Sequence, residues 1–279
     1  MPKIKDYSLY LVVSEEYGQG KTALEIASAA IYGGVDIIQM REKNKTKQEL
    51  TALGNKLSRL CRENNALFIV NDDPFVTKEV NADGVHLGQE DIKRFRLEDV
   101  RSILGQDKII GISTHSLEQF QEANNKDFDY IAFGPVFPTQ TKDYFIGTKD
   151  IEEVLKIAKK PVVFIGGINL SNISELLSAG VRNIALIRAI LQAKDITLET
   201  KKFRQKFNVK RQDMIIKING KEESIDKEIK LIDLISKKNL CSEKIIIEHN
   251  FKIIDKEKWP DIILAEFDNL EIVSFVGGG

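Results

Sequence analysis

Cysteine is scarce in this sequence: Cys61 and Cys241 are the only two, and they fall in different predicted domains. This scarcity argues against a disulfide framework and fits two reduced thiols in a cytosolic protein. Long apolar runs are also missing, and none of those present could span a bilayer. The opening residues Met1–Asp6 lack the apolar stretch and the small-residue cleavage site of a signal peptide. We therefore expect a cytoplasmic protein with no membrane partner.

Charge of one sign does not accumulate anywhere along the chain. The formal net charge is -1, and basic and acidic residues are mixed throughout. The lack of a basic block argues against a nucleic-acid partner, and the lack of an acidic tail argues against a disordered segment. What is present is ordinary globular composition, with 42% hydrophobic and 30% charged residues. A length of 279 residues suits one large domain and a small one.

One unit repeats from the start of the chain to about Lys206: a short β-branched run, a polar turn and an amphipathic helix. The predicted strands are Leu9–Val13, Val35–Met40, Leu67–Val70, Gly84–Leu87, Lys108–Ile112, Tyr130–Phe133, Val162–Ile165 and Asn183–Ile187. Helical patterns lie between them, as at Thr22–Ile31, Lys47–Arg62, Leu117–Ala123, Ile151–Ala158 and Asn172–Ser178. Eight strands alternating with helices predict a parallel (β/α)8 TIM barrel over residues 1–206. A doubly wound open sheet is the alternative, but no Gly-x-Gly-x-x-Gly follows the first strand.

The pattern changes after the barrel, where a charged linker is predicted at residues 207–213 and a second domain at residues 214–279. In this domain Met214–Asn219 and Lys221–Ile225 flank Gly220 as a hairpin, Asp226–Lys238 is a predicted helix, and Lys244–Glu248 and Leu270–Val276 are predicted strands. The order β-β-α-β-β predicts a small α+β domain, and in about this length it suggests a β-grasp, the ubiquitin fold.

Barrel enzymes place their chemistry at the C-terminal ends of the strands, so we expect the site among the residues at each strand end. The second strand ends in Gln39, Arg41 and Lys43, which can point to one side because side chains alternate along a strand. Two cations and an amide that face the barrel mouth would make an anion site. A solvated, charge-rich turn is the alternative.

Carboxylates follow the third and fourth strands. Asn71-Asp72-Asp73 ends one, and Asp91 comes shortly after the other. Two carboxylates, here Asp72 and Asp91, with waters and phosphate oxygens, are how Mg²⁺ is usually held. Helix capping before Pro74 is the alternative for Asp72 or Asp73, and an exposed turn is the alternative for Asp91. Cations and carboxylates on consecutive strand ends together favour metal–diphosphate binding.

The fifth and sixth strand ends offer further polar groups. Ser113 or His115 can reach the centre of the mouth, and we assign His115 a supporting role only. The loop after the sixth strand is stiffened by two prolines and then offers two hydroxyls and a cation, from Thr139, Thr141 and Lys142. Such a loop suits an anionic substrate, and an ordinary long loop is the alternative.

The seventh strand runs into Gly166-Gly167, and the eighth runs into Ile187-Arg188. The loops after these two strands form the usual phosphate site of this architecture, from backbone N–H groups and a helix N-terminus. Gly167 would let the backbone approach the phosphate closely.

Together these segments resemble thiamine-phosphate synthase. The resemblance is carried by Gln39–Lys43, Asn71–Asp73, His86–Asp91, Gly134–Lys142 and Gly166–Ile168, and it spans nearly the whole barrel. It implies a Mg²⁺-dependent transferase that joins hydroxymethylpyrimidine diphosphate to a thiazole phosphate and releases diphosphate. No protein nucleophile is required, because the thiazole nitrogen captures the pyrimidylmethyl cation.

The resemblance also implies a role for each residue. It makes Asp72 and Asp91 the Mg²⁺ ligands, and the groups that contact the diphosphate or its metal are Arg41, Lys43, Asn71, Ser113 and Lys142. Gln39 would hydrogen-bond the aminopyrimidine. The thiazole phosphate would be held by Thr139, Thr141, Gly167 and the backbone at Ile187 and Arg188. Arg188 departs from the family pattern, in which a serine commonly follows the isoleucine after the eighth strand.

The C-terminal domain, Met214–Gly279, resembles the sulfur-carrier protein of thiazole synthesis. The resemblance is carried by the Asn219-Gly220 turn, the segment around Trp259 and the ending Val273–Gly279. It implies that Gly278-Gly279 enters an E1-like adenylyltransferase and becomes a thiocarboxylate that serves thiazole synthase. Glycines lack the side chains that would obstruct that entry. A frayed terminus is the alternative.

Two other interpretations stay open. One makes the barrel a thiazole tautomerase or a regulatory relative, although Gln89-Glu90-Asp91 argues against a tautomerase. The other makes the C-terminal module a plain ubiquitin-like docking domain. The sequence also leaves open whether the protein forms a homo-oligomer.

Overall fold

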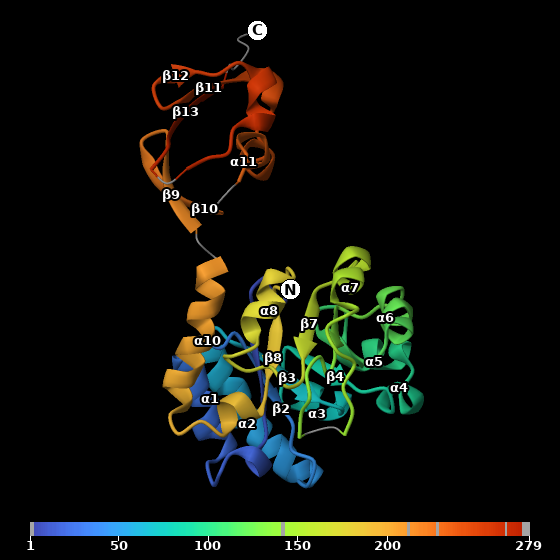
Figure 1. Ribbon diagram of the computed structural model, residues 1–279. Coiled ribbons are helices and arrows are strands. Elements are labelled where there is room, and N and C mark those ends of the chain that lie inside the picture. The colour runs from blue at the N-terminus through green and yellow to red at the C-terminus, as the bar shows by residue number, and fades with distance from the viewer. Residues whose placement is uncertain (1–2, 141–142, 211–212, 227–228, 266, 275–279) are drawn as a thin grey trace. The chain divides into compact units, whose positions relative to one another are not determined.

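The computed structural model describes residues 3–140, 143–210, 213–226, 229–265 and 267–274 (Figure 1). The chain divides into two compact units, Met1–Phe207 and Asn208–Gly279. Among the described residues, no helix combines the length and the apolar character that crossing a membrane requires.

The first unit is a closed barrel of eight parallel strands in sequence order, which confirms the predicted TIM barrel. The strands are β1 (Leu9–Val13), β2 (Ile37–Met40), β3 (Leu67–Asn71), β4 (Gly84–Leu87), β5 (Ile109–Thr114), β6 (Tyr130–Phe133), β7 (Val162–Ile165) and β8 (Ile184–Leu186). Most are buried along their whole length, as expected of parallel strands covered on both faces.

Helices cover the outside of the barrel (Figure 1). They are α1 (Ala23–Tyr32), α2 (Lys47–Glu63), α3 (Pro74–Glu79), α4 (Asp91–Arg94), α5 (Leu97–Leu104), α6 (Leu117–Asn124), α7 (Ile151–Ile157), α8 (Ile173–Ser178), α9 (Arg188–Leu191) and α10 (Ile196–Lys210), and a 3₁₀ turn η1 (Glu15–Tyr17) precedes α1. Capping boxes fix where α1 and α2 begin: Thr22 pairs with Glu25, and Thr46 pairs with Glu49.

The barrel has two layers of packed side chains. Outward-facing strand residues pack beneath the helices in one large core. Inward-facing residues fill the barrel with a second cluster that includes Tyr10, Val12, Ile69, Tyr130 and Val163. Filling the interior in this way leaves the C-terminal mouth as the place for a site.

The second unit is a mixed sheet with strand order β10-β9-β13-β11-β12. Its elements are β9 (Asp213–Ile218), β10 (Lys221–Asp226), α11 (Leu231–Lys237), η2 (Ser242–Lys244), β11 (Ile245–His249), β12 (Lys252–Ile253), η3 (Lys256–Asp261) and β13 (Asn269–Ser274). The central strands β9 and β13 are parallel, and β9–β10 is an antiparallel hairpin. A helix packed on such a sheet is a β-grasp, as the sequence suggested. Trp259 is buried in its core, where Nε1 donates to the carbonyl oxygen of Ile254 at 3.2 Å.

Two sequence predictions need correction in this part of the chain, and one short strand was missed. The helix expected over Asp226–Lys238 begins only at Leu231, because β10 extends to Asp226 and Lys230 forms a bridge with Ile263. The two-residue strand β12 was not predicted. Residues 207–210, expected in a linker, are the last residues of α10.

Candidate functional site

A cavity of about 630 Å³ lies at the C-terminal ends of the barrel strands. It gathers eleven of the predicted site residues: Gln39, Arg41, Lys43, Asn71, Asp72, Asp91, Ser113, Thr139, Gly167, Ile187 and Arg188. Four others, Thr141, Lys142, Gly278 and Gly279, lie outside the described residues. Residues separated by up to about 150 positions in sequence therefore meet because each follows or ends a strand of one closed sheet.

Asp72 and Asp91 both line this cavity, and Asp91 is close enough to act on the Asp72 carboxyl. Asp72 has a φ of 66°, a left-handed conformation that is uncommon for aspartate and is found preferentially at functional sites. Its backbone N–H donates to the carbonyl oxygen of His86 at 2.8 Å, which holds it against β4. Asp91 opens α4, and its Oδ2 accepts from the backbone N–H of Gly88 at 2.7 Å.

The electrostatics of the pair are those of two crowded acids beside two cations. Burial, followed by the hydrogen bond and charge of Asp91, raises the pKa of Asp72 to about 7. Arg41 and Lys43 act in the opposite direction, because a positive charge favours the carboxylate. With a pKa near 7, the Asp72 carboxyl gives up its proton more readily when a bound cation offsets the negative charge.

The neighbouring Asp73 has the other role that the sequence left open. Its Oδ1 accepts from the backbone N–H groups of Phe75 and Val76, at 2.8 and 2.9 Å, and so caps α3. Pro74 occupies the first turn, where no N–H is needed. Capping is therefore assigned to Asp73, and Asp72 is left to face the cavity.

Few protein groups in this cavity are suited to hold a metal. Among the residues that the structure describes, no group of three or more His, Cys, Asp or Glu side chains is arranged to hold a metal. The pair Asp72–Asp91 matches the one or two carboxylates with which proteins usually hold Mg²⁺, when water and substrate phosphates complete its shell.

Sequence reasoning missed a chain of polar groups inside the barrel. Gln39 Nε2 donates to the Tyr10 hydroxyl at 2.8 Å, and this hydroxyl lies 2.9 Å from that of Tyr130. The Tyr130 hydroxyl is 2.7 Å from His86 Nδ1, and His86 Nε2 is 2.7 Å from Ser113 Oγ. Tyr10, His86 and Tyr130 sit within apolar strands. Their only signal was a polar atom at an inward-facing position of an otherwise apolar strand.

His115 also lines the cavity. Its Nδ1 lies 2.6 Å from the carbonyl oxygen of Gly134, and its ring meets the edge of Tyr144 with centroids 5.9 Å apart. A carbonyl oxygen only accepts, so Nδ1 carries a proton. The contact ties the end of β5 to the loop after β6, which is consistent with the supporting role expected of His115.

Arg188 connects three segments at the rim. Its Nη1 donates to Gln140 Oε1 at 2.9 Å in the β6–α7 loop, and its guanidinium lies 4.3 Å from the centre of the Tyr17 ring in η1. Its Nε is buried and, within the described part of the chain, has no hydrogen-bond partner. A buried, unpaired N–H on a cation is a group that an anionic ligand could satisfy.

Gly167 lies where two loops of the barrel mouth pack against each other. Its φ is 66°, and a Cβ there would lie 2.4 Å from the carbonyl oxygen of Pro138 and 2.8 Å from the carbonyl carbon of Phe137. The glycine is thus required where the β7–α8 loop packs on the backbone of the β6–α7 loop. Close packing of the two protein loops by itself requires a glycine here.

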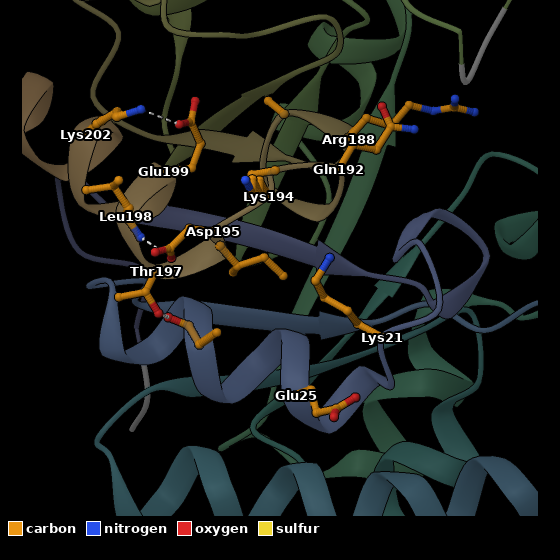
Figure 2. Close-up of a pocket in the computed structure, with 14 residues that line it drawn as sticks. Lys21, Glu25, Arg188, Gln192, Lys194, Asp195, Thr197, Leu198, Glu199 and Lys202 are labelled. Carbon is orange, nitrogen blue, oxygen red and sulfur yellow. Dashed lines mark hydrogen bonds and ion pairs between the residues drawn. The ribbon is translucent and has the colours of Figure 1, made fainter.

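A second hollow, of about 980 Å³, lies outside the barrel between α1 and the α9–α10 segment (Figure 2). Of the predicted site residues it includes only Arg188, whose side chain extends away from the other labelled residues (Figure 2). Its charged groups include Glu199 and Lys202, which pair with each other at 2.9 Å. Size alone therefore does not identify the site; the convergence of carboxyls and cations at the mouth does.

Comparison with known proteins agrees with this geometry. Residues 9–190 match the family model "Thiamine monophosphate synthase", and residues 204–279 match "ThiS family". The chain is 41% identical over 201 residues to thiamine-phosphate synthase of Persephonella marina, covering 71% of this chain and 95% of that one. It is 41% identical over 196 residues to that of Shouchella clausii, covering 69% and 92%.

A solved structure, thiamine phosphate pyrophosphorylase from Pyrococcus furiosus, is 38% identical to this chain, with a TM-score of 0.66. It covers 73% of this chain and 96% of its own length. The chain therefore belongs to the thiamine monophosphate synthase family and carries a C-terminal domain of the ThiS family.

Proposed function

We propose that the barrel condenses hydroxymethylpyrimidine diphosphate with thiazole phosphate to give thiamine phosphate and diphosphate. The observation that carries the proposal is the presence, in one cavity, of the Asp72–Asp91 pair beside Arg41 and Lys43. The similarity to two thiamine-phosphate synthases, each 41% identical to this chain over the matched residues, supports the proposal. A cavity of about 630 Å³ is within the usual size range for small-molecule sites.

Mg²⁺ is part of the proposal, with Asp72 and Asp91 as its protein ligands. The fit rests on the pair itself: burial and the neighbouring acid raise the pKa of Asp72 to about 7, and a cation bound to both carboxyls would favour their ionised forms. Bound there, Mg²⁺ would neutralise charge on the leaving diphosphate.

The chain's own residues bind and orient the first substrate. Arg41 and Lys43, which follow β2, and Asn71, which ends β3, line the cavity. In this proposal they hold the diphosphate oxygens, as do Ser113 and Lys142. Gln39 holds the aminopyrimidine. When the C–O bond breaks, diphosphate leaves with the electron pair, and the cations stabilise the charge that develops on it.

The second substrate binds on the opposite side of the mouth. Thr139, Thr141, Gly167 and the backbone at Ile187 and Arg188 hold its phosphate. Its ring nitrogen forms the new C–N bond to the pyrimidylmethyl carbon, which needs no nucleophile from the protein. Positioning the two substrates together lowers the barrier, because a bimolecular encounter becomes a reaction within one complex.

For the second unit we propose sulfur transfer. Its support is the match of residues 204–279 to the ThiS family and the β-grasp topology. The Gly278-Gly279 end would be adenylylated by an E1-like adenylyltransferase, converted to a thiocarboxylate, and presented to thiazole synthase.

The barrel proposal is tested by incubating the full-length protein with the two synthetic substrates, with and without Mg²⁺, and quantifying thiamine phosphate. We expect product only when both substrates and Mg²⁺ are present. Absence of product with Mg²⁺ would refute the activity, whereas equal turnover after chelation would refute the metal assignment alone.

A further inference from the structure

The hydrogen-bonded chain inside the barrel has a direction, which protonation states and donor geometry determine. Its five members run from Gln39 through Tyr10, Tyr130 and His86 to Ser113. The three inner members are at most 7% exposed. In such a setting each hydrogen must have its own acceptor, because a buried polar hydrogen without a partner is costly.

The protonation states of the inner members are fixed by burial. The buried His86 ring has Nδ1 against the Tyr130 hydroxyl and Nε2 against Ser113 Oγ, so a ring that accepts at Nδ1 carries a single N–H, on its other nitrogen. Burial raises the pKa of Tyr10 and of Tyr130, so both phenols keep their hydrogen. Each of the three side chains therefore has one hydrogen to donate along the chain.

The amide of Gln39 sets the direction. Since its Nε2 donates to the Tyr10 oxygen, the Tyr10 hydrogen is directed to Tyr130 and the Tyr130 hydrogen to His86 Nδ1. The single N–H of His86 is then on Nε2 and points at Ser113 Oγ. In the opposite direction the Tyr10 hydrogen would meet the N–H of Gln39, donor against donor.

Gln39 and Ser113, the two ends of the hydrogen-bonded chain, line the mouth cavity. Gln39, having donated through its nitrogen, presents Oε1 as an acceptor. Ser113, having accepted from His86, keeps its own hydrogen to donate. An acceptor at one end suits an amino group, and a donor at the other suits a phosphate oxygen.

We propose that Tyr10, Tyr130 and His86 are positioning residues, which hold Gln39 as the acceptor for the substrate's amino group and Ser113 as a donor to the leaving diphosphate. This inference rests on the proposed function. The hydrogen-bonded chain would couple recognition of the pyrimidine to stabilisation of the leaving group. If the Gln39 amide turned over, every hydrogen bond from Tyr10 to Ser113 would reverse, and Ser113 would no longer be free to donate to the diphosphate.

The direction is tested without turnover by ¹⁵N NMR of the full-length protein labelled at histidine. The sequence has three histidines, so assignment needs few variants. We expect His86 as the neutral tautomer protonated at Nε2. His115 is an internal reference with a proton on Nδ1, because that atom faces the Gly134 carbonyl. A proton on Nδ1 of His86, or a charged ring at neutral pH, overturns the inference.

The coupling is tested by kinetics in Mg²⁺ with Tyr130→Phe, Ser113→Ala and the double variant. Removing a residue that orients another typically costs about 10- to 100-fold, so we expect such a loss of kcat in Tyr130→Phe, with a smaller change in KM for the pyrimidine diphosphate. Its His86 resonances should no longer show a single tautomer. In the Ser113→Ala background the Tyr130→Phe change should have little further effect, because it acts through that hydroxyl.

Tyr32→Phe is the matched control, because Tyr32 is 76% exposed on α1, and its kcat should equal that of wild type. Additive losses in the double variant overturn the coupling while leaving the proposed function intact. Wild-type protein that makes no thiamine phosphate overturns the proposed function instead, and the tautomer of His86 still decides the direction of the chain. Thermal denaturation of each variant identifies any that fails to fold. For such a variant, the ¹⁵N spectrum of the wild-type protein still tests the direction of the hydrogen bonds.

Discussion

At the scale of single residues, Asp72 and Asp73 are adjacent yet serve different purposes. The left-handed backbone of Asp72 turns its carboxyl towards Asp91, whereas Asp73 caps α3. We expect Asp72→Asn and Asp91→Asn each to lower kcat at saturating Mg²⁺ by about 10²-fold or more, the loss typical when a charge-stabilising group is removed from an active site. The measurement is initial rate against Mg²⁺ concentration, with circular dichroism to confirm the fold.

Asp73→Asn is the control for both variants, since asparagine caps a helix about as well as aspartate. Its Mg²⁺ dependence should match that of wild type. Wild-type rates in Asp72→Asn or Asp91→Asn at limiting Mg²⁺ would show that these carboxyls are not the metal ligands.

His86 makes a pH-dependent contribution to stability. Its pKa is lowered from 6.5 to about 3 in the fold, so below pH 6.5 the unfolded chain binds a proton that the folded chain does not. The folded state is therefore destabilised as pH falls from 6.5 towards 3, by up to about 1.4 kcal/mol per pH unit. Replacing His86 with Gln removes this term.

We accordingly expect the free energy of unfolding of wild type to fall more steeply than that of His86→Gln between pH 6.5 and 4.5. Urea denaturation at several pH values measures both, and the difference between the two proteins cancels the other titrating groups. Parallel curves would mean that His86 is protonated as readily in the folded protein as in the unfolded chain.

At the scale of elements, the loops after β6 and β7 depend on each other. A Cβ on Gly167 would clash with the Phe137–Pro138 backbone and would also sit at positive φ. Gly105 has a φ of 87° but nothing within 4 Å of its Cβ position. Gly105→Ala should therefore cost only the backbone strain, about 1–3 kcal/mol. Gly167→Ala should cost more and should lower turnover, as measured by denaturation and by assay.

Arg188 joins α9 to the same loop through Gln140 and to η1 through Tyr17. We expect Arg188→Ser to raise KM for the thiazole phosphate by about 10-fold or more, as loss of a charge-assisted hydrogen bond does. KM for the pyrimidine diphosphate should change much less. Gln140→Ala removes the hydrogen bond from Arg188 to the loop but keeps the charge of Arg188, so it separates the two effects. Equal effects of Arg188→Ser on both substrates would contradict a place beside the thiazole phosphate.

Most barrel strands could be predicted from the sequence because a buried parallel strand needs a β-branched apolar run, and few other elements do. Capping boxes at Thr22 and Thr46 likewise make helix starts visible. The start of α11 could not be found this way, because the bridge from Lys230 to Ile263 is a tertiary contact. The two-residue strand β12 is too short to show the alternating hydrophobic pattern of a strand.

The candidate site likewise contains some residues that the sequence reveals and others that it does not. Charged residues at strand ends, such as Arg41 and Asp91, stand out because the barrel dictates where they meet. His86 and Tyr130 do not, because their importance comes from hydrogen bonds across the barrel that no local pattern records. Gly167 stands out in the sequence as a glycine at a strand end, but its packing against the Phe137–Pro138 backbone is a tertiary contact that the sequence does not reveal.

At the scale of the whole molecule, two units have separate cores. The barrel core and the core around Trp259 share no residue. Domains with their own cores keep their folds when the other is altered. Changes confined to Gly278-Gly279 should therefore leave barrel turnover nearly unchanged.

Our last prediction is that this end, and not the barrel, acquires sulfur. Incubation with ATP, an E1-like adenylyltransferase and a sulfur source should shift the intact mass by about sixteen units, as expected when sulfur replaces oxygen in an activated carboxyl. Deleting Gly278 and Gly279 should abolish the shift.

If the truncated protein still gains mass, a thiol is responsible. Burial raises the pKa of Cys61 to about 12, so its thiolate is suppressed, and the exposed Cys241 would be the group to replace first. If truncation stops condensation instead, the two units are coupled despite their separate cores.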